Sequence, residues 1–258
     1  MTEPTLQNAG LAAATDICVK CGLCLPHCPT YQNSSDENES PRGRLSLIQG
    51  WATGRLELTP KLKTHVDHCL LCRSCEAACP ANVAYGRIVD DFRAACKEHG
   101  APEPQGERAV QHLALALLTG NQPRLIQSGL GHIARSSAGQ SIARQFGLES
   151  MAQGLPQKRS GTRTIKPGLY TPESSQSHDS VQLFLGCTAV LFDSETLDAC
   201  VHLLNALGIA VEVPDDQGCC GALDQHAGER ARALEMITRN ETAFGGSGTD
   251  PVISYATG

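Results

Sequence analysis

Cys18-Val-Lys-Cys21-Gly-Leu-Cys24-Leu-Pro-His-Cys28-Pro29 and Cys69-Leu-Leu-Cys72-Arg-Ser-Cys75-Glu-Ala-Ala-Cys79-Pro80 decide how the first part of this chain folds. In both runs three cysteines are separated by two residues each, and a fourth follows after three more, directly before a proline. Three side chains at this step wrap a tight loop around one centre. The repeat therefore predicts two loops of the same kind.

The spacing is that of bacterial two-cluster ferredoxins, whose fourth cysteine ligates the other [4Fe–4S] cluster. It predicts two [4Fe–4S] clusters with crossed ligation. Cluster 1 would use Cys18, Cys21, Cys24 and Cys79, and cluster 2 would use Cys69, Cys72, Cys75 and Cys28.

Structural zinc in an interaction module is the alternative for these cysteines. Zinc sites typically pair two Cys-x2-Cys knuckles, four ligands in all. Here a third cysteine follows at the same step and the whole run recurs, which favours iron–sulfur. His27, His65 and His68 flank the runs and are expected to pack near the clusters rather than replace a cysteine.

Composition and charge exclude several functions. The net charge is −6 and aromatic residues make up 4% of the chain, so we expect no nucleic-acid partner. The N-terminus lacks a secretion signal, and the apolar run Leu113–Leu118 is too short to span a bilayer. The 13 cysteines then indicate metal ligands in a cytoplasmic chain rather than disulfides, with peripheral attachment to the inner membrane left open.

Four zones follow from the cysteine distribution and the periodicity. We expect a helical dicluster ferredoxin-like domain at 1–100, with helices at 44–51, entered through Pro41, and at 82–98, where Ile88, Val89, Phe92 and Cys96 share a face. A helical connector at 101–152 includes an apolar helix at 108–118. Residues 153–180 are rich in Gly, Pro, Ser and Thr and read as a polar linker, either a solvated tether or a docking segment for a partner or an anionic membrane surface.

Residues 181–258 have the pattern of an α/β domain. Strands are expected at 181–186, 210–213 and 251–255, with helices at 195–207 and 228–244 between them. This alternation predicts a parallel sheet with right-handed crossovers. The predicted class is thus α+β/α: a helical first domain, a helical middle region and a C-terminal α/β domain.

A third cysteine group lies in this last zone. Gly186-Cys187 and Gln217-Gly-Cys219-Cys220-Gly221-Ala222 resemble the cysteine-rich CCG domain of heterodisulfide reductase subunits. That resemblance implies that Cys187, Cys219 and Cys220 bind an additional iron–sulfur centre, with a redox-active dithiol or buried thiols as the alternative. The family pattern has its next cysteine 34–38 residues on, so the domain is expected to be incomplete and the third centre to lack a ligand here.

The whole combination resembles the glycolate oxidase iron–sulfur subunit. The resemblance rests on the two quartets, Cys28-Pro-Thr-Tyr31, Pro41-Arg-Gly-Arg44 and the CCG elements, and covers the chain more loosely through 100–180. It implies FAD-containing partner subunits that oxidise glycolate, with D-lactate as a second substrate, and an acceptor such as quinone. Iron–sulfur subunits of anaerobic glycerol-phosphate dehydrogenase, lactate-utilisation or heterodisulfide reductase-type complexes are the alternatives.

Five residues have open or minor roles at this stage. Arg42 and Arg44 would favour reduced clusters if they lie near them, or could form an ordinary helix entry. Cys96 and Cys200 are predicted to be core thiols, and no role follows for His226. No catalytic residue is expected, since the sequence has neither a Gly-x-Gly-x-x-Gly after a strand nor a phosphate-binding Gly-x-x-x-x-Gly-Lys motif.

Overall fold

Three α-helices in the first part of the chain begin at prolines. In the computed structural model, Pro29, Pro41 and Pro60 each occupy the first turn of a helix, where the missing N–H costs nothing. The Gly43 N–H donates to Ser40 Oγ over 2.9 Å, which caps the second of these helices. These local signals set where the helices start.

The structure describes residues 6–101, 165–172, 179–245 and 250–254, together with residues 139, 141, 144 and 145. The chain divides into two units, which are taken separately below. Unit 1 is Met1–Glu103 with Leu223–Ala231, and unit 2 is Pro104–Ala222 with Arg232–Gly258.

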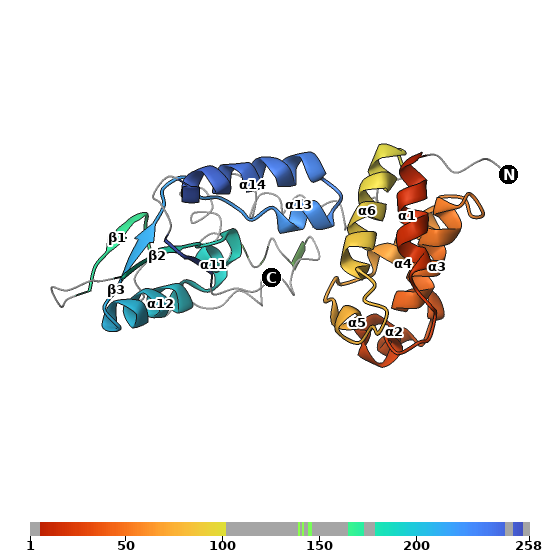
Figure 1. Cartoon of the computed structure of the whole chain (residues 1–258), viewed down its shortest axis with the longest axis horizontal. Helices are drawn as coiled ribbons and strands as arrows, with labels where there is room; N and C mark the ends of the chain where they lie inside the picture. Colours follow the sequence, from red (N-terminus) through yellow and green to blue (C-terminus); the bar gives the residue numbers. More distant parts are fainter. Residues whose placement is uncertain are drawn as a thin grey trace. The chain divides into compact units, whose positions relative to one another are not determined.

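Unit 1 is built of helices and loops (Figure 1). Its core lies between the longer helices, where the rings of Trp51 and Phe92 meet edge to face with centroids 5.2 Å apart. Ile48, Val66 and Val89 are fully buried beside them. The elements of its N-terminal part are α1 (Leu6–Asp16), η1 (Leu25–His27), α2 (Pro29–Ser34), η2 (Glu37–Glu39), α3 (Pro41–Ala52), α4 (Pro60–Asp67), α5 (Ser74–Ala77) and α6 (Tyr85–Glu98).

The helices predicted for this unit are confirmed with small shifts. The one expected at 44–51 is α3, which does start at Pro41. The one expected at 82–98 begins three residues later, at Tyr85, because Asn82 adopts a left-handed φ of 50°. Its apolar face is buried as expected, and Cys96 is a core thiol.

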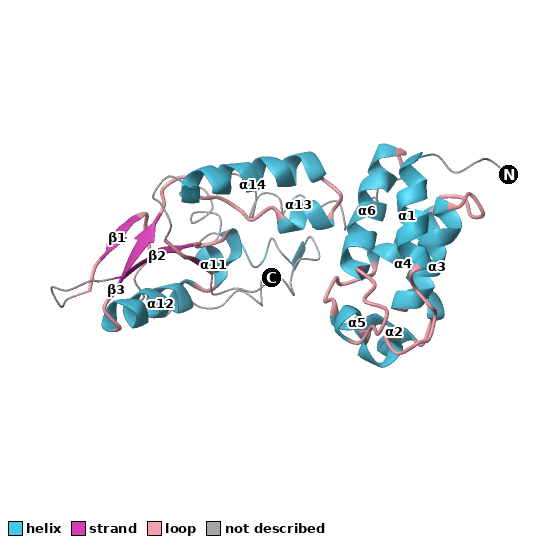
Figure 2. Cartoon of the chain, in the orientation of Figure 1, coloured by secondary structure: helices cyan, strands magenta, loops and turns pink. Residues whose placement is uncertain are grey.

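Unit 2 contains all the strands that the structure describes (Figure 2). The sheet order is β1-β3-β2-β4, and Val181 of β2 lies opposite Val211 of β3. Leu183, Leu197 and Val211 are buried in its core. The elements here are β1 (Gly168–Tyr170), β2 (Asp179–Leu183), α11 (Cys187–Phe192), α12 (Ser194–Ala206), β3 (Ile209–Val213), α14 (Arg230–Gly245) and β4 (Val252–Ile253). From Leu223 on, α13 (Ala222–His226) belongs to unit 1, as do the first two residues of α14.

The sheet is mixed, so the prediction of an all-parallel sheet is wrong. β2 pairs in parallel with β3 and β4, as expected, but β1 runs antiparallel to β3. β1 falls in the segment expected to be a polar linker. It is only three residues long, two of them exposed, and it has no hydrophobic run by which the sequence could indicate a strand. The short helices α11 and α13 were also missed.

Other predictions about organisation lie largely outside the described residues. Outside the described residues lie the helix expected at 108–118, most of the connector at 101–152 and most of the linker at 153–180. The domain boundaries stay predictions. No helix in the described part of the chain has the length and apolar character needed to cross a membrane.

Gly43→Ala tests the helix start that carries both arginines of α3. An alanine Cβ at this position would overlap the Glu37 carbonyl oxygen. Because this oxygen is a backbone atom, it cannot move aside as easily as a flexible side chain could. We expect a loss of about 1–3 kcal/mol in unfolding free energy, measured by denaturant titration. Gly10→Ala in α1, where nothing lies within 4 Å of the new methyl, should instead be neutral or stabilising. Equal stability of the two variants would contradict the close approach.

Candidate iron–sulfur centres

The first cysteine site is an open cavity in unit 1. Its lining includes three cysteines from the first quartet and the last cysteine of the second quartet: Cys18, Cys21, Cys24 and Cys79. Arg42 also lines this cavity. The structure therefore brings together the set that the sequence assigned to cluster 1.

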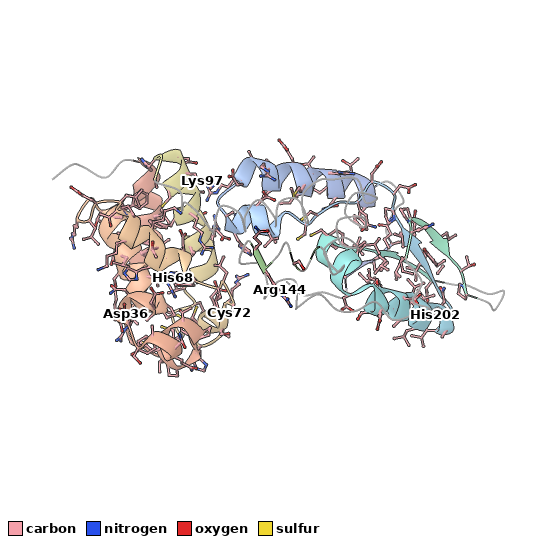
Figure 3. All side chains as sticks on the ribbon, turned by 180° about the vertical axis from the view of Figure 1, so that it is seen from behind. Asp36, His68, Cys72, Lys97, Arg144 and His202 are labelled. Carbon is pink, nitrogen blue, oxygen red and sulfur yellow. The ribbon has the colours of Figure 1, made fainter. Side chains whose placement is uncertain are left out.

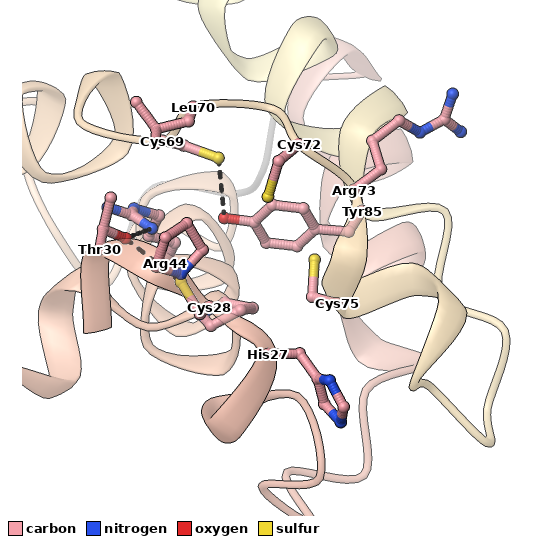
Figure 4. A pocket seen from close by; sticks show the side chains of 12 residues that line it. His27, Cys28, Thr30, Arg44, Cys69, Leu70, Cys72, Arg73, Cys75 and Tyr85 are labelled. Carbon is pink, nitrogen blue, oxygen red and sulfur yellow. Dashed lines mark hydrogen bonds between the residues drawn. The ribbon is translucent and has the colours of Figure 1, made fainter. Parts of the chain in front are cut away.

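The second cysteine site is an open cavity in the same unit (Figure 4). Its four cysteines are Cys28, Cys69, Cys72 and Cys75, and Arg44, Tyr85 and His27 complete part of its lining. This is the set assigned to cluster 2, with Cys28 coming from the other quartet. Ligation itself stays a prediction, but the crossed grouping of the side chains is what it requires.

Left-handed backbone shapes both loops around their second cysteine. Lys20 and Gly22 flank Cys21 with φ of 57° and 84°. Leu71 and Arg73 flank Cys72 with φ of 52° and 57°. Such residues are costly unless glycine, and they aim successive backbone N–H groups into a concavity that favours negative charge. Both loops are thus suited to an electron-rich sulfide cluster.

Burial of the cysteines varies within each site. Cys21 and Cys72 are exposed, and Cys72 lies on the loop before α5 (Figure 3). Cys75 is buried, and burial together with neighbouring thiols raises its pKa to about 12. Burial also raises the pKa of Cys24. Thiolates at these positions need a positively charged group to bind, as iron would supply.

The arrangement fits a group larger than one metal ion. Four sulfurs around one zinc ion at 2.3 Å lie within about 4 Å of one another. Among the residues that the structure describes, no three His, Cys, Asp or Glu side chains converge on such a point. The cysteines of each set line the wall of a pocket instead.

A buried charge network lies beside the second site. Arg44 donates to Glu39 Oε2 over 2.6 Å, to the His65 carbonyl over 2.7 Å and to Thr30 Oγ1 over 3.0 Å. Thr30 Oγ1 is in turn 3.2 Å from Cys28 Sγ. The Tyr85 hydroxyl is 3.6 Å from Cys69 Sγ (Figure 4).

Glu39 is held as a carboxylate in this network. Burial alone would raise its pKa, but hydrogen bonds from His65 and His68 and the charge of Arg44 outweigh that and lower the pKa. The two histidine Nδ1 atoms lie 2.7 and 3.0 Å from Glu39 Oε1. These histidines thus contact Glu39, and sequence reasoning missed this carboxylate because nothing marks it in an acidic loop.

The third cysteine group gathers in unit 2 at the ends of two parallel strands. Cys187 follows β2 and Cys219 follows β3, so their side chains meet at one edge of the sheet, with the sulfurs 3.3 Å apart. The pKa of Cys219 is raised by its contact with Cys187 and by burial. The pKa of Cys220 is raised by a hydrogen bond with Cys219 and by burial.

Two amides that the sequence analysis did not single out hold these segments. The buried Gln217 accepts from the Leu185 N–H over 2.7 Å and donates to the Leu183 carbonyl over 3.0 Å. Asn240 accepts from the Gly218 N–H and donates to the Cys219 carbonyl. Gln217 stands inside the quoted Gln-Gly-Cys-Cys run, and its place there was the available signal.

Two more residues named from the sequence, Cys200 and His226, pack against or contact other parts of their own unit. Cys200 is partly buried against the core of unit 2, and burial raises its pKa. His226 lies in unit 1, where its Nδ1 is 3.0 Å from Asp90 Oδ1.

Comparison with known proteins agrees with this geometry. A family profile for a 4Fe-4S dicluster domain matches residues 14–83, and one for a cysteine-rich domain matches residues 181–258. The glycolate oxidase iron-sulfur subunit of Escherichia coli (strain K12) is 33% identical over 254 residues, which is 95% of this chain. The chain is thus similar to a glycolate oxidase iron–sulfur subunit over most of its own length. It spans 56% of the length of that relative.

Other relatives extend the same comparison. The "Probable glycolate oxidase iron-sulfur subunit" of Bacillus subtilis (strain 168) is 31% identical over 255 residues, covering 93% of this chain and 56% of the relative. The Hdr-like menaquinol oxidoreductase iron-sulfur subunit 2 of Archaeoglobus fulgidus is 26% identical over 155 residues, covering 50% of this chain and 28% of the relative. No solved structure matches the chain significantly.

Replacing Cys28 with alanine tests the crossed grouping of the cysteines. Because Cys28 lines the second site, we expect the cluster held by Cys69, Cys72 and Cys75 to be lost and the other to be kept. Paramagnetic spectra assigned with Cys21→Ala and Cys72→Ala would identify the survivor. Cys200→Ala, outside both sites, should keep both signals. If Cys28→Ala has the same spectrum as Cys21→Ala, the ligation is local.

Gln217→Ala tests the clamp at the third group. Without this amide the Leu185 N–H and Leu183 carbonyl lose their buried partner, so we expect a loss of about 1–3 kcal/mol in unfolding free energy. Limited proteolysis should then cut unit 2 faster. Glu235→Ala on the exposed side of α14 is the control. Equal proteolysis of the two variants would show that the clamp is not needed.

Proposed function

We propose that this chain is the electron-transfer subunit of a glycolate oxidase-type complex. FAD-containing partner subunits oxidise glycolate, with D-lactate as a second substrate, to the 2-oxo acid. Electrons then pass through this chain to an acceptor such as quinone. The observation that carries the proposal is the pair of four-cysteine cavities in unit 1, each completed by a cysteine of the other run.

The chain's own residues explain why the two sites suit electron transfer. When bound, a [4Fe–4S] cluster takes up and releases one electron at a time. Cys24 and Cys28 are separated only by η1, and Cys75 and Cys79 only by the end of α5. Four residues of such helix advance roughly 6–8 Å. One cysteine of each pair lines each site, so the two sites must be close neighbours.

The division of labour follows from electron counting. Oxidising a 2-hydroxy acid removes two electrons, and an iron–sulfur cluster takes one. A flavin on a partner can accept the pair and release electrons singly. The cysteine sites of this chain are therefore proposed to accept electrons, and the alcohol chemistry is assigned to the partner.

Cys187, Cys219 and Cys220 are proposed to ligate an additional iron–sulfur centre in the intact protein. Their gathering at one sheet edge and the match to the cysteine-rich domain support this. A redox-active dithiol is the alternative for the close pair Cys187 and Cys219.

A heterodisulfide reductase-type electron-transfer role is the second candidate. It is favoured by the Archaeoglobus relative, which covers half of this chain. The two glycolate oxidase relatives match 93% and 95% of the chain at higher identity, so the glycolate role is the better supported. We place the chain in the cytoplasm, with peripheral attachment to the inner membrane through its partners as an option.

Reconstitution of this chain with its flavoprotein partners tests the function. The chain alone should hold about eight iron atoms in its two quartets and should not oxidise glycolate. With the partners, electron flow to an artificial or quinone acceptor should appear. Cys72→Ala should slow or abolish that flow while the flavin is still reduced by glycolate, and Cys200→Ala should behave as wild type.

Two outcomes would contradict the proposal. Glycolate oxidation by the isolated, flavin-free chain would overturn the division of labour. Stoichiometric zinc with little iron would show that unit 1 is a structural module.

A further inference from the structure

The start of α3 directs one arginine to each cysteine site. Arg42 lines the first site and Arg44 lines the second. Residues two apart on an α-helix lie about 200° apart around its axis. A single helical turn can therefore supply a guanidinium to two neighbouring cavities.

Each guanidinium is held by a glutamate five residues earlier. Arg42 Nε lies 2.6 Å from Glu37 Oε1, and Arg44 Nη2 lies 2.6 Å from Glu39 Oε2. Neither glutamate is among the residues lining the two cavities. The positive end of each pair is thus the end that faces a cysteine site.

Contacts to the cysteine loops fix the orientation of both arginines. Arg42 Nη1 donates to the Lys20 carbonyl over 3.2 Å, and a Cβ on Gly22 would come within 2.6 Å of the same nitrogen. Arg44 is joined to Cys28 through the Thr30 hydroxyl. An ordinary helix entry would not need either contact.

The two pairs differ in burial. The Arg44 side chain is 1% exposed and that of Arg42 is 31% exposed. A charge acts more strongly in a buried site than beside water, where salt also screens it. Reduction potentials of iron–sulfur clusters depend on just such nearby charge.

We propose that Arg42 and Arg44 each raise the reduction potential of one cluster, Arg44 by more, so that an added electron is favoured on the Arg44 side. The proposal rests on the proposed function in one respect, that both cavities hold clusters. It assigns a role to the charge of each arginine that is separate from its part in the fold.

Potentiometric titration of the anaerobically reconstituted chain with dithionite tests this assignment. Each cluster takes one electron from the reductant, and paramagnetic spectra assigned with the ligand variants report the two clusters separately. All variants are measured at the same pH, because His65 and His68 also contact Glu39.

Opposite charges should move the potentials in opposite directions. Arg44→Gln should lower the reduction equilibrium constant of the second-site cluster about tenfold, which is about 59 mV for one electron. Glu39→Gln should raise it. At the first-site cluster only, Arg42→Gln should lower the reduction equilibrium constant and Glu37→Gln should raise it, both by smaller factors. Raising the salt concentration should shrink the Arg42→Gln shift and leave the Arg44→Gln shift.

A purely structural role predicts a different result. If arginine and glutamate variants shift a potential in the same direction, or if each arginine variant moves both clusters equally, the proposal is overturned. Unchanged potentials would also overturn it. Where Arg44→Gln fails to hold its iron, Arg44→Lys and Glu39→Gln decide: the lysine should keep the potential near wild type, and the glutamine should raise it. Absence of clusters from the wild-type chain would overturn the proposed function instead.

Discussion

The buried ion pair between Arg44 and Glu39 is the interaction on which the second cysteine site depends. Glu39 ends η2, while the partners of Arg44 include the carbonyl of His65 in α4 and the hydroxyl of Thr30 in α2. Those helices lead directly to Cys69 and follow Cys28. Removing one partner of a buried pair costs about 3–5 kcal/mol, because the other charge is left without compensation. The pair therefore holds the two chain segments that supply this site in one arrangement.

Because each site of unit 1 includes a cysteine from the other run, the formation of one site depends on the formation of the other. Neither loop completes its own cavity, since each lacks a fourth sulfur until the other loop is in place. The left-handed residues beside Cys21 and Cys72 would be unfavourable in an isolated loop, and the surrounding helices hold them. The same constraint keeps the sites close, which is the property that an electron-transfer subunit needs.

In unit 2 the parallel pairing of β2 and β3 brings the cysteines of the third group together. Parallel strands end at the same edge of a sheet, and the segments that follow them carry Cys187 and Cys219. Gln217 then joins those segments by hydrogen bonds to the Leu183 and Leu185 backbone. A sulfur pair 32 positions apart in the chain is thereby brought to 3.3 Å.

The cysteine spacing was enough to predict the two loops, because a two-residue step leaves a loop few ways to present three sulfurs. The ferredoxin pattern, rather than the step itself, predicted the exchange of Cys28 and Cys79. Periodicity likewise predicted α3, α6, α12 and β3, whose buried faces repeat regularly. It could not find β1, which is short and mostly exposed, and so the antiparallel edge of the sheet was missed. Periodicity also could not identify Glu39 as a partner of Arg44, nor show that Arg42 and Arg44 line different cavities. Those depend on which segments meet in space, and the burial that gives each charge its strength exists only once the helices have packed.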